Sequence, residues 1–175
     1  MPNHVVNEIV IEGDATLFDR VLAKISTAQS PIDFEALLPL PLNAWAYSQS
    51  TKHEQAFPIM AMDWTRQNWG TKWNAYGIDD GYQSIVRTDT HLTLTFQTAG
   101  GPPLGWILAL HNALKLSFTY GYLSEGGTPA RDGWFRAPVN DFSDAWDEAD
   151  ASPVRQRYLH KLLWGVESFP DEAPA

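Results

Sequence analysis

The stretch that decides the fold is residues 91–98, His-Leu-Thr-Leu-Thr-Phe-Gln-Thr, the cleanest alternation of apolar and polar residues in the chain. Leu92, Leu94 and Phe96 fall on one face of the predicted strand, and threonine and glutamine fall on the other. Directly afterwards, residues 100–103 (Gly-Gly-Pro-Pro) open a run with apolar residues at helical spacing. The pattern predicts a half-buried strand that leads into a helix.

Working outward, the same two patterns recur on both sides. Residues 4–12 are rich in β-branched residues and predict a first strand, and Asp14 then caps a helix that runs to about residue 28. Further strands are predicted over residues 83–88 and 116–123, with an edge strand over residues 133–137. Their order is strand, helix, two strands, helix, strand.

That order predicts an α+β protein with the ferredoxin-like split β-α-β sandwich, in which the helices cover one face of an antiparallel sheet. We expect one domain over residues 1–140, with an irregular insertion at 31–82. Residues 141–175 are expected to form an acidic segment and a C-terminal helix packed on the same domain. Ser152-Pro153 marks the start of that helix, whose predicted apolar stripe is Val154, Tyr158, Leu159, Leu162 and Leu163.

The insertion carries a Trp-rich block. Prolines at 39 and 41 predict an extended segment over residues 34–42, and a short helix is predicted at 60–67. Asn68 and Gly70 then supply positions that tolerate positive φ. The block offers a candidate aromatic and polar surface, made of Trp69, Lys72, Trp73, Asn74 and Tyr76. The sequence leaves open whether this block is a binding pocket or structural core.

Composition narrows the function classes. The 175 residues include no cysteine, which excludes disulfides, thiolate catalysis and zinc–sulfur sites. No secretory signal and no apolar run long enough to span a bilayer is evident, so we expect a cytoplasmic protein of a bacterial host. The formal net charge of −9 opposes binding to duplex phosphate.

Three stretches resemble the YubB-type family of plasmid- and phage-borne proteins with a ferredoxin-like domain. They are residues 1–7, residues 68–76 (Asn-Trp-Gly-Thr-Lys-Trp-Asn-Ala-Tyr) and residues 94–99 ahead of Pro102-Pro103. The similarity covers roughly residues 1–135, and it departs from the family at Gly100, where members usually carry tryptophan. It implies the ferredoxin-like fold and a place on mobile genetic elements, and it supplies no catalytic residues.

The residues indicate no enzyme, cofactor or metal. The five histidines are scattered without metal-ligand spacing, and the serines lack a nucleophile elbow. A chain without cysteine also lacks the usual ligands of an iron–sulfur cluster, so "ferredoxin-like" describes topology alone.

Two binding functions remain, beside a structural role with no ligand. The first hypothesis is an acidic, protein-binding inhibitor of a host nucleic-acid-binding or defence system of the restriction or CRISPR type, whose carboxylates imitate phosphates. Its candidate residues are Asp141, Asp144, Asp147, Glu148 and Asp150, with a solvated linker as the plain alternative. The second is a single-stranded nucleic-acid-binding module that stacks bases on sheet aromatics such as Trp73, Tyr76, Tyr120 and Tyr122.

Overall fold

The computed structural model describes residues 3–42, 61–76, 83–125, 130–135 and 146–165. Within this part of the chain, six strands form one antiparallel sheet in the order β2-β3-β1-β4-β5-β6. The strands are β1 (His4–Glu12), β2 (Ser84–Arg87), β3 (His91–Ala99), β4 (Phe118–Ser124), β5 (Arg131–Phe135) and β6 (Trp146–Asp150). The helices are α1 (Ala15–Ile25), α2 (Phe34–Leu37), α5 (Ala61–Asn68), α6 (Leu104–Leu114) and α8 (Pro153–Trp164).

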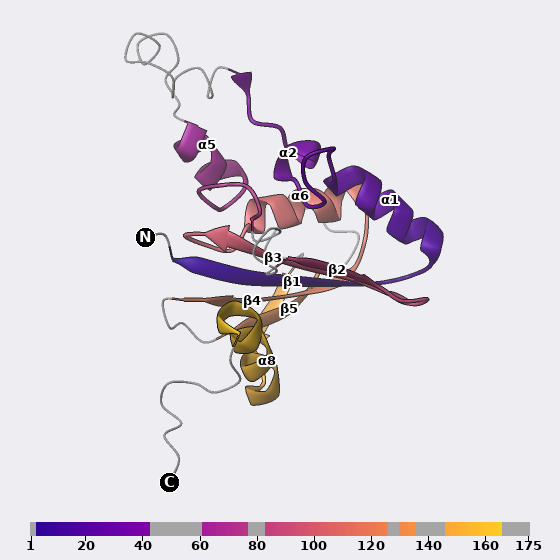
Figure 1. Cartoon of the computed structure of the whole chain (residues 1–175), viewed down its shortest axis with the longest axis vertical. Coiled ribbons are helices and arrows are strands. Elements are labelled where there is room, and N and C mark those ends of the chain that lie inside the picture. Colours follow the sequence, from indigo (N-terminus) through magenta and orange to yellow (C-terminus); the bar gives the residue numbers. More distant parts are fainter. Residues whose placement is uncertain (1–2, 43–60, 77–82, 126–129, 136–145, 166–175) are drawn as a thin grey trace.

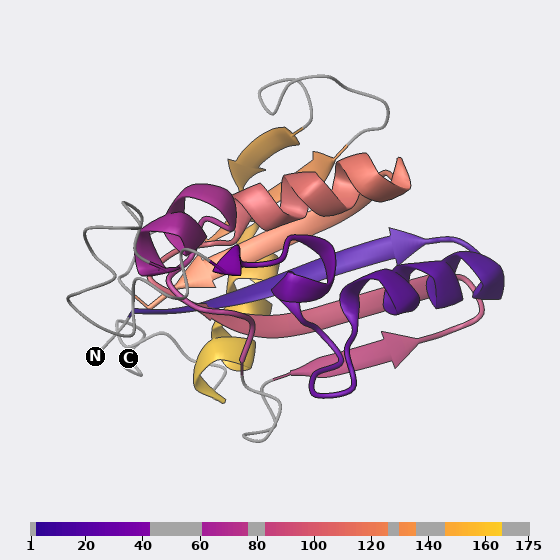
Figure 2. The ribbon, with the colours of Figure 1, turned by 90° about the horizontal axis from the view of Figure 1, so that it is seen from above.

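The sheet is covered on both faces. Helices α1, α2, α5 and α6 lie over one face, as Figure 2 shows from above, and α8 lies alone against the other (Figure 1). The sequence-based prediction does not specify which face the C-terminal helix covers, and the structure places α8 on the second face. A mixed α and β fold around an antiparallel sheet is confirmed.

The main core lies between the sheet and the four helices on its first face. Leu92, Leu94 and Phe96 are fully buried there, as the alternation predicts, but Thr95 and Gln97 are buried too, so the prediction of a half-buried strand is wrong for the second half of β3. The same core holds Ile9 and Ile11 of β1, with apolar residues of α1 and α6 against them. Asp14 caps α1 as predicted, because its carboxylate accepts a hydrogen bond from the N–H of Leu17 at 2.8 Å.

Two predicted elements in this layer differ from the structure. Residues 34–37 form the short helix α2 instead of an extended segment, because Asp33 caps it and accepts from the N–H of Glu35. The Asn74 side chain, 40 residues away, accepts from the N–H of Phe34 at 2.7 Å and supports the same turn. The strand predicted at 133–137 is β5, which lies inside the sheet between β4 and β6 instead of at its edge.

A second, smaller core joins α8 to the sheet. It contains Val6, Leu123, Ala130, Ala151, Leu159 and Leu163. Ser152 caps α8 as predicted, with Pro153 in the first turn. The predicted apolar stripe is partly wrong, because Val154 is 70% exposed and Tyr158 is 42% exposed. Only the C-terminal half of α8 is held by apolar packing.

Candidate functional site

Of the five acidic residues singled out in the sequence, three lie in the described part of the chain and two do not. Asp141 and Asp144 lie outside the described residues, whereas Asp147, Glu148 and Asp150 belong to strand β6. The solvated linker considered for this segment is therefore wrong over residues 146–150, which form a strand. These three acidic residues occupy fixed positions in a sheet.

Pairing with β5 sets the register of this strand. Asp147 stands opposite Trp134, Glu148 opposite Gly133 and Asp150 opposite Arg131. The Asp150 carboxylate and the Arg131 guanidinium are 2.8 Å apart, an attractive cross-strand pair that favours this register. Within the described part of the chain, β5 is the only strand that pairs with β6, which is therefore an edge strand.

The Trp-rich block is mainly structural. The Trp69 indole is 2% exposed and donates to the carbonyl of Leu38 at 2.8 Å, so Trp69 is core and its place in the candidate surface is wrong. Gly70 turns the chain with a φ of +91°, and a Cβ there would lie 2.9 Å from backbone atoms of Pro102 and Leu104. The prediction of positive φ is confirmed for Gly70 but not for Asn68, which ends α5.

The remaining members of the candidate surface have different roles. Asn74 binds the α2 turn through Phe34 and Asp33, and Lys72 lies against Gly100. Trp73 is 51% exposed, with its ring edge-on to Tyr76. Trp73 is thus the one large ring of this block, among the described residues, that is more than half exposed.

Tyr76 connects the start of β1 with the end of β3 through hydrogen bonds to His4 and Thr98. Its hydroxyl donates to the carbonyl of Thr98 at 2.9 Å and lies 2.5 Å from Nδ1 of His4. Because the phenol has a single proton, His4 must donate from Nδ1 to the phenol oxygen. Burial, with a smaller contribution from the Glu125 carboxylate, raises the pKa of Tyr76 to about 12, which keeps the phenol protonated.

Tyrosines proposed for base stacking do not form a platform on the open face of the sheet. Tyr120 is fully buried in the main core and donates to the Asn7 side chain at 2.7 Å, and Tyr122 packs partly buried against the same core. Both belong to the core on the first face of the sheet, or pack against it. The sheet platform of an RNA-recognition module is therefore wrong for these two rings.

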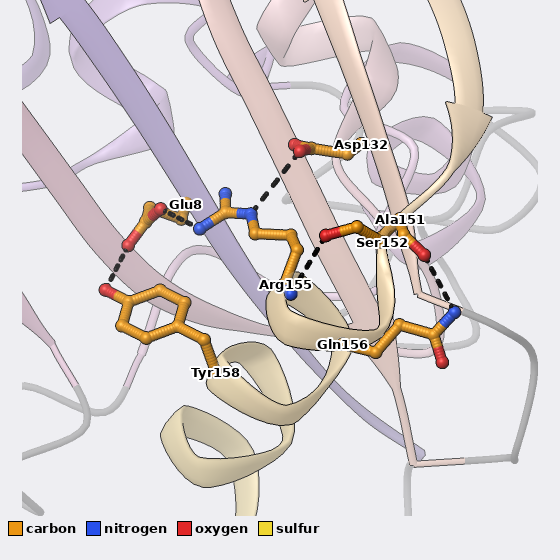
Figure 3. A network of polar contacts seen from close by, with 7 residues as sticks. All are labelled: Glu8, Asp132, Ala151, Ser152, Arg155, Gln156 and Tyr158. Atoms are coloured by element: carbon orange, nitrogen blue, oxygen red, sulfur yellow. Dashed lines mark hydrogen bonds and ion pairs between the residues drawn. The ribbon is translucent and has the colours of Figure 1, made fainter.

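A polar network that sequence reasoning missed lies beneath α8 (Figure 3). The Glu8 side chain, in the middle of β1, is 3% exposed. Its carboxylate accepts from the Arg155 guanidinium and from the Tyr158 hydroxyl, both at 2.5 Å. Arg155 also lies 3.5 Å from the Asp132 carboxylate of β5. Burying Glu8 is tolerable only because each of its oxygens has a charged or hydroxyl donor.

Gly121 of β4 forms the floor of this network. It pairs with Glu8 on one side and with Asp132 on the other, so the three residues form one row across three neighbouring strands. A Cβ on Gly121 would lie 2.7 Å from Oδ1 of Asp132 and 2.8 Å from a guanidinium nitrogen of Arg155. The missing side chain is what lets the guanidinium lie against the sheet.

Asp132 is incompletely satisfied in this arrangement. Its Oδ1 is buried without a hydrogen-bond partner. Burial raises the pKa of Asp132 above its ordinary value; the Arg155 guanidinium opposes this rise, and the Glu8 carboxylate adds to it. The carboxylates of Glu8 and Asp132 share the single guanidinium of Arg155, so two acidic groups face one positive charge.

Beside the network is an open hollow of about 450 Å³, lined by Glu8, Val10, Thr93, Ser152, Val154, Arg155 and Tyr158. It lies between the first turns of α8 and the second face of the sheet. Within the described ranges, no cluster of three metal-ligating side chains is present. The lining of the hollow combines the Glu8 carboxylate with the ring of Tyr158.

One signal in the sequence could have indicated this site. Glu8 stands beside Asn7 in the middle of a first strand that is apolar on both sides of them, and an ionisable residue there needs a partner if both faces are buried. Arg155 and Tyr158 stand at i and i+3 of a capped helix, hence on one helical face. Nothing local joins the two segments, because Glu8 and Arg155 lie 147 positions apart in the sequence.

No family model, curated protein or solved structure matches this chain. The resemblance to YubB-type proteins therefore stays a prediction. Of the helices that the structure describes, none has the length and apolar character needed to cross a membrane.

Proposed function

We propose that the protein is a non-enzymatic, acidic binding protein that inhibits a host nucleic-acid-binding or defence protein. The observation that carries this proposal is the position of Asp147, Glu148 and Asp150 on the edge strand β6. Backbone positions in a strand have fixed spacing, unlike those in a solvated linker, with Glu148 and Asp150 assigned to one face of the strand and Asp147 to the other. A basic channel that binds phosphates would be attracted to these acidic residues by the same electrostatics that attract nucleic acid.

Charge and topology support the proposal further. The chain carries 21 acidic residues against 12 lysines and arginines, so its overall field attracts basic partners. Strand order β2-β3-β1-β4, with helices between β1 and β2 and between β3 and β4, supports a ferredoxin-like unit to which β5, β6 and α8 are added. A cytoplasmic location in the host of a phage or plasmid is part of the same proposal and follows from the resemblance.

The direct test is neutralisation of the acidic residues. Asp141, Asp144, Asp147, Glu148 and Asp150 are replaced by Asn or Gln, and capture of partners from bacterial lysate is compared with wild type after nuclease treatment. We expect the wild-type protein to capture basic proteins that stay bound after nuclease treatment and are eluted by salt. We expect the variant not to capture them. Melting curves of both proteins should coincide, because the exposed Asp150–Arg131 pair contributes little to stability.

A matched control neutralises acidic residues away from β6. The control draws on four exposed acidic residues outside β6. Glu12 ends β1, Asp14 precedes α1, Asp19 lies in α1 and Asp63 lies in α5. Asp19, Glu12 and Asp63 alone are replaced, because Asp14 caps α1. Because this control removes three charges, it is compared with a variant neutralised at Asp147, Glu148 and Asp150 alone. Equal loss of binding in the two would mean that net charge, and not the β6 positions, determines capture.

Trp73 favours a second candidate, single-stranded nucleic-acid binding. An exposed indole edge-on to Tyr76 is available for stacking by one base. Under this alternative, Trp73→Ala weakens oligonucleotide binding by about 1–3 kcal/mol in a fluorescence titration at low salt. An unchanged titration curve would remove this candidate.

A further inference from the structure

The row Glu8–Gly121–Asp132 has the form of a receptor for a guanidinium group. The two carboxylates come from β1 and β5, and the bare glycine of β4 lies between them in register. Strands are spaced about 4.8 Å apart, so the acids flank a flat strip wide enough for a planar guanidinium. Figure 3 shows Arg155 of α8 lying between Glu8 and Asp132.

The resident arginine does not use this receptor fully. Arg155 reaches Glu8 at 2.5 Å but approaches Asp132 only through Nε at 3.5 Å, and Oδ1 of Asp132 stays without a partner. A guanidinium in bidentate geometry places two N–H groups on the two oxygens of one carboxylate. Arg155 does not adopt that geometry at either carboxylate, whereas an arginine from another chain would approach without attachment to the α8 backbone.

The part of α8 that holds Arg155 is also its least packed part. Val154 is 70% exposed and Tyr158 is 42% exposed, while the buried residues Leu159 and Leu163 lie in later turns. The open hollow of about 450 Å³ adjoins these first turns. An entering side chain therefore has a path to the row once the first turns of α8 lift.

We propose that the Glu8–Gly121–Asp132 row is an arginine-binding site that Arg155 occupies within the chain, and that an arginine of a basic partner replaces it. Helix α8 is then an internal competitor, and partner binding releases its first turns from the sheet. That the arginine entering the site belongs to a partner protein rests on the proposed function. That the site binds a guanidinium group does not depend on it. A lysine would fit less well, because an ammonium group cannot contact both carboxylates across the strip.

The test uses full-length Arg155→Ala with N-acetyl-arginine N-methylamide as the probe. Removing Arg155 empties the site, so thermal stability should rise saturably with the probe, with an affinity about tenfold or more above that of the wild-type protein. N-acetyl-lysine N-methylamide at the same ionic strength should give a much smaller shift. Adding Glu8→Gln to Arg155→Ala should abolish the response to the arginine probe.

Each other outcome decides the matter as well. If Arg155→Ala alone does not fold, restoration of a cooperative melting transition by the arginine probe supports the site, and failure to restore it overturns the proposal. Equal shifts with both probes, or in the Glu8→Gln double variant, would also overturn it. Retained partner capture by the β6 variant, together with an intact arginine response, would overturn the proposed function alone, so the two proposals fail separately.

Discussion

Two tryptophans four positions apart show how one residue type serves different purposes in this protein. Trp69 is buried between Phe34 and Trp64, with edge-to-face ring contacts at 5.6 and 5.8 Å, and its indole N–H is bonded. Trp73 points its ring toward solvent. The density of aromatic residues in the sequence indicates a structured block. Only the burial seen in the structure distinguishes the core residue Trp69 from the surface residue Trp73.

The first prediction concerns these two rings. Trp69→Ala should lower the free energy of unfolding by about 3–5 kcal/mol, because it removes a buried ring and leaves a cavity. The matched change Trp73→Ala should alter it by less than about 0.5 kcal/mol. Urea denaturation of both variants measures the difference, and equal destabilisation would contradict the burial assigned here.

The second prediction concerns alkaline pH. Burial raises the pKa of Tyr76 and of Tyr158 from 10.0 to about 12, with the Glu8 hydrogen bond and charge contributing at Tyr158. The unfolded phenols ionise near pH 10 and the folded ones only near 12, so stability is fully present below pH 10 and is lost progressively up to pH 12.

Melting temperatures from pH 9 to about 12 measure this loss. Tyr76→Phe and Tyr158→Phe should each flatten the pH dependence in this window, because each removes one titrating group. An alkaline profile that neither substitution changes would contradict the roles of the two phenols.

At the scale of elements, α8 is attached to the sheet by two different kinds of contact. Its later turns hold it to the sheet by a small apolar cluster, and its first turn holds it through Arg155. A buried ion pair of this kind adds less stability than apolar packing but makes one docking geometry preferable to others.

The third prediction tests the floor of this contact. Gly121→Ala should loosen the first turns of α8, because the added Cβ meets Asp132 and Arg155 at under 3.0 Å. We expect faster amide hydrogen exchange in α8 and little change in α1 or α6. Unchanged exchange of α8 would show that the guanidinium does not lie against Gly121.

Local signals in the sequence predicted most of the helices and strands, but they predicted little of how these elements are arranged in space. Alternation in residues 91–98 and the caps Asp14 and Ser152 identified β3, α1 and α8 correctly, because alternation and capping act over a few residues. The face that α8 covers depends on Glu8 and Arg155, which lie at opposite ends of the chain. The helix at 34–37 depends likewise on Asn74, a contact that no local pattern specifies.

At the scale of the whole molecule, acidic residues occur both on the surface and inside. Asp150 is exposed on an edge strand, whereas Glu8 is buried in the centre of the sheet. Exposed acids attract a basic partner at long range, and buried acids select the geometry of a guanidinium at contact. Both features are consistent with a protein that binds a basic surface.

The measurement that tests this account most directly is competition for a partner captured by the protein. A labelled DNA duplex bound to that partner is titrated with wild-type protein and with the variant neutralised at Asp141, Asp144, Asp147, Glu148 and Asp150. The account predicts that the wild-type protein displaces the duplex, less effectively as salt rises, and that the variant does not. A stable complex containing partner, duplex and protein together, or equal displacement by the variant, would contradict it.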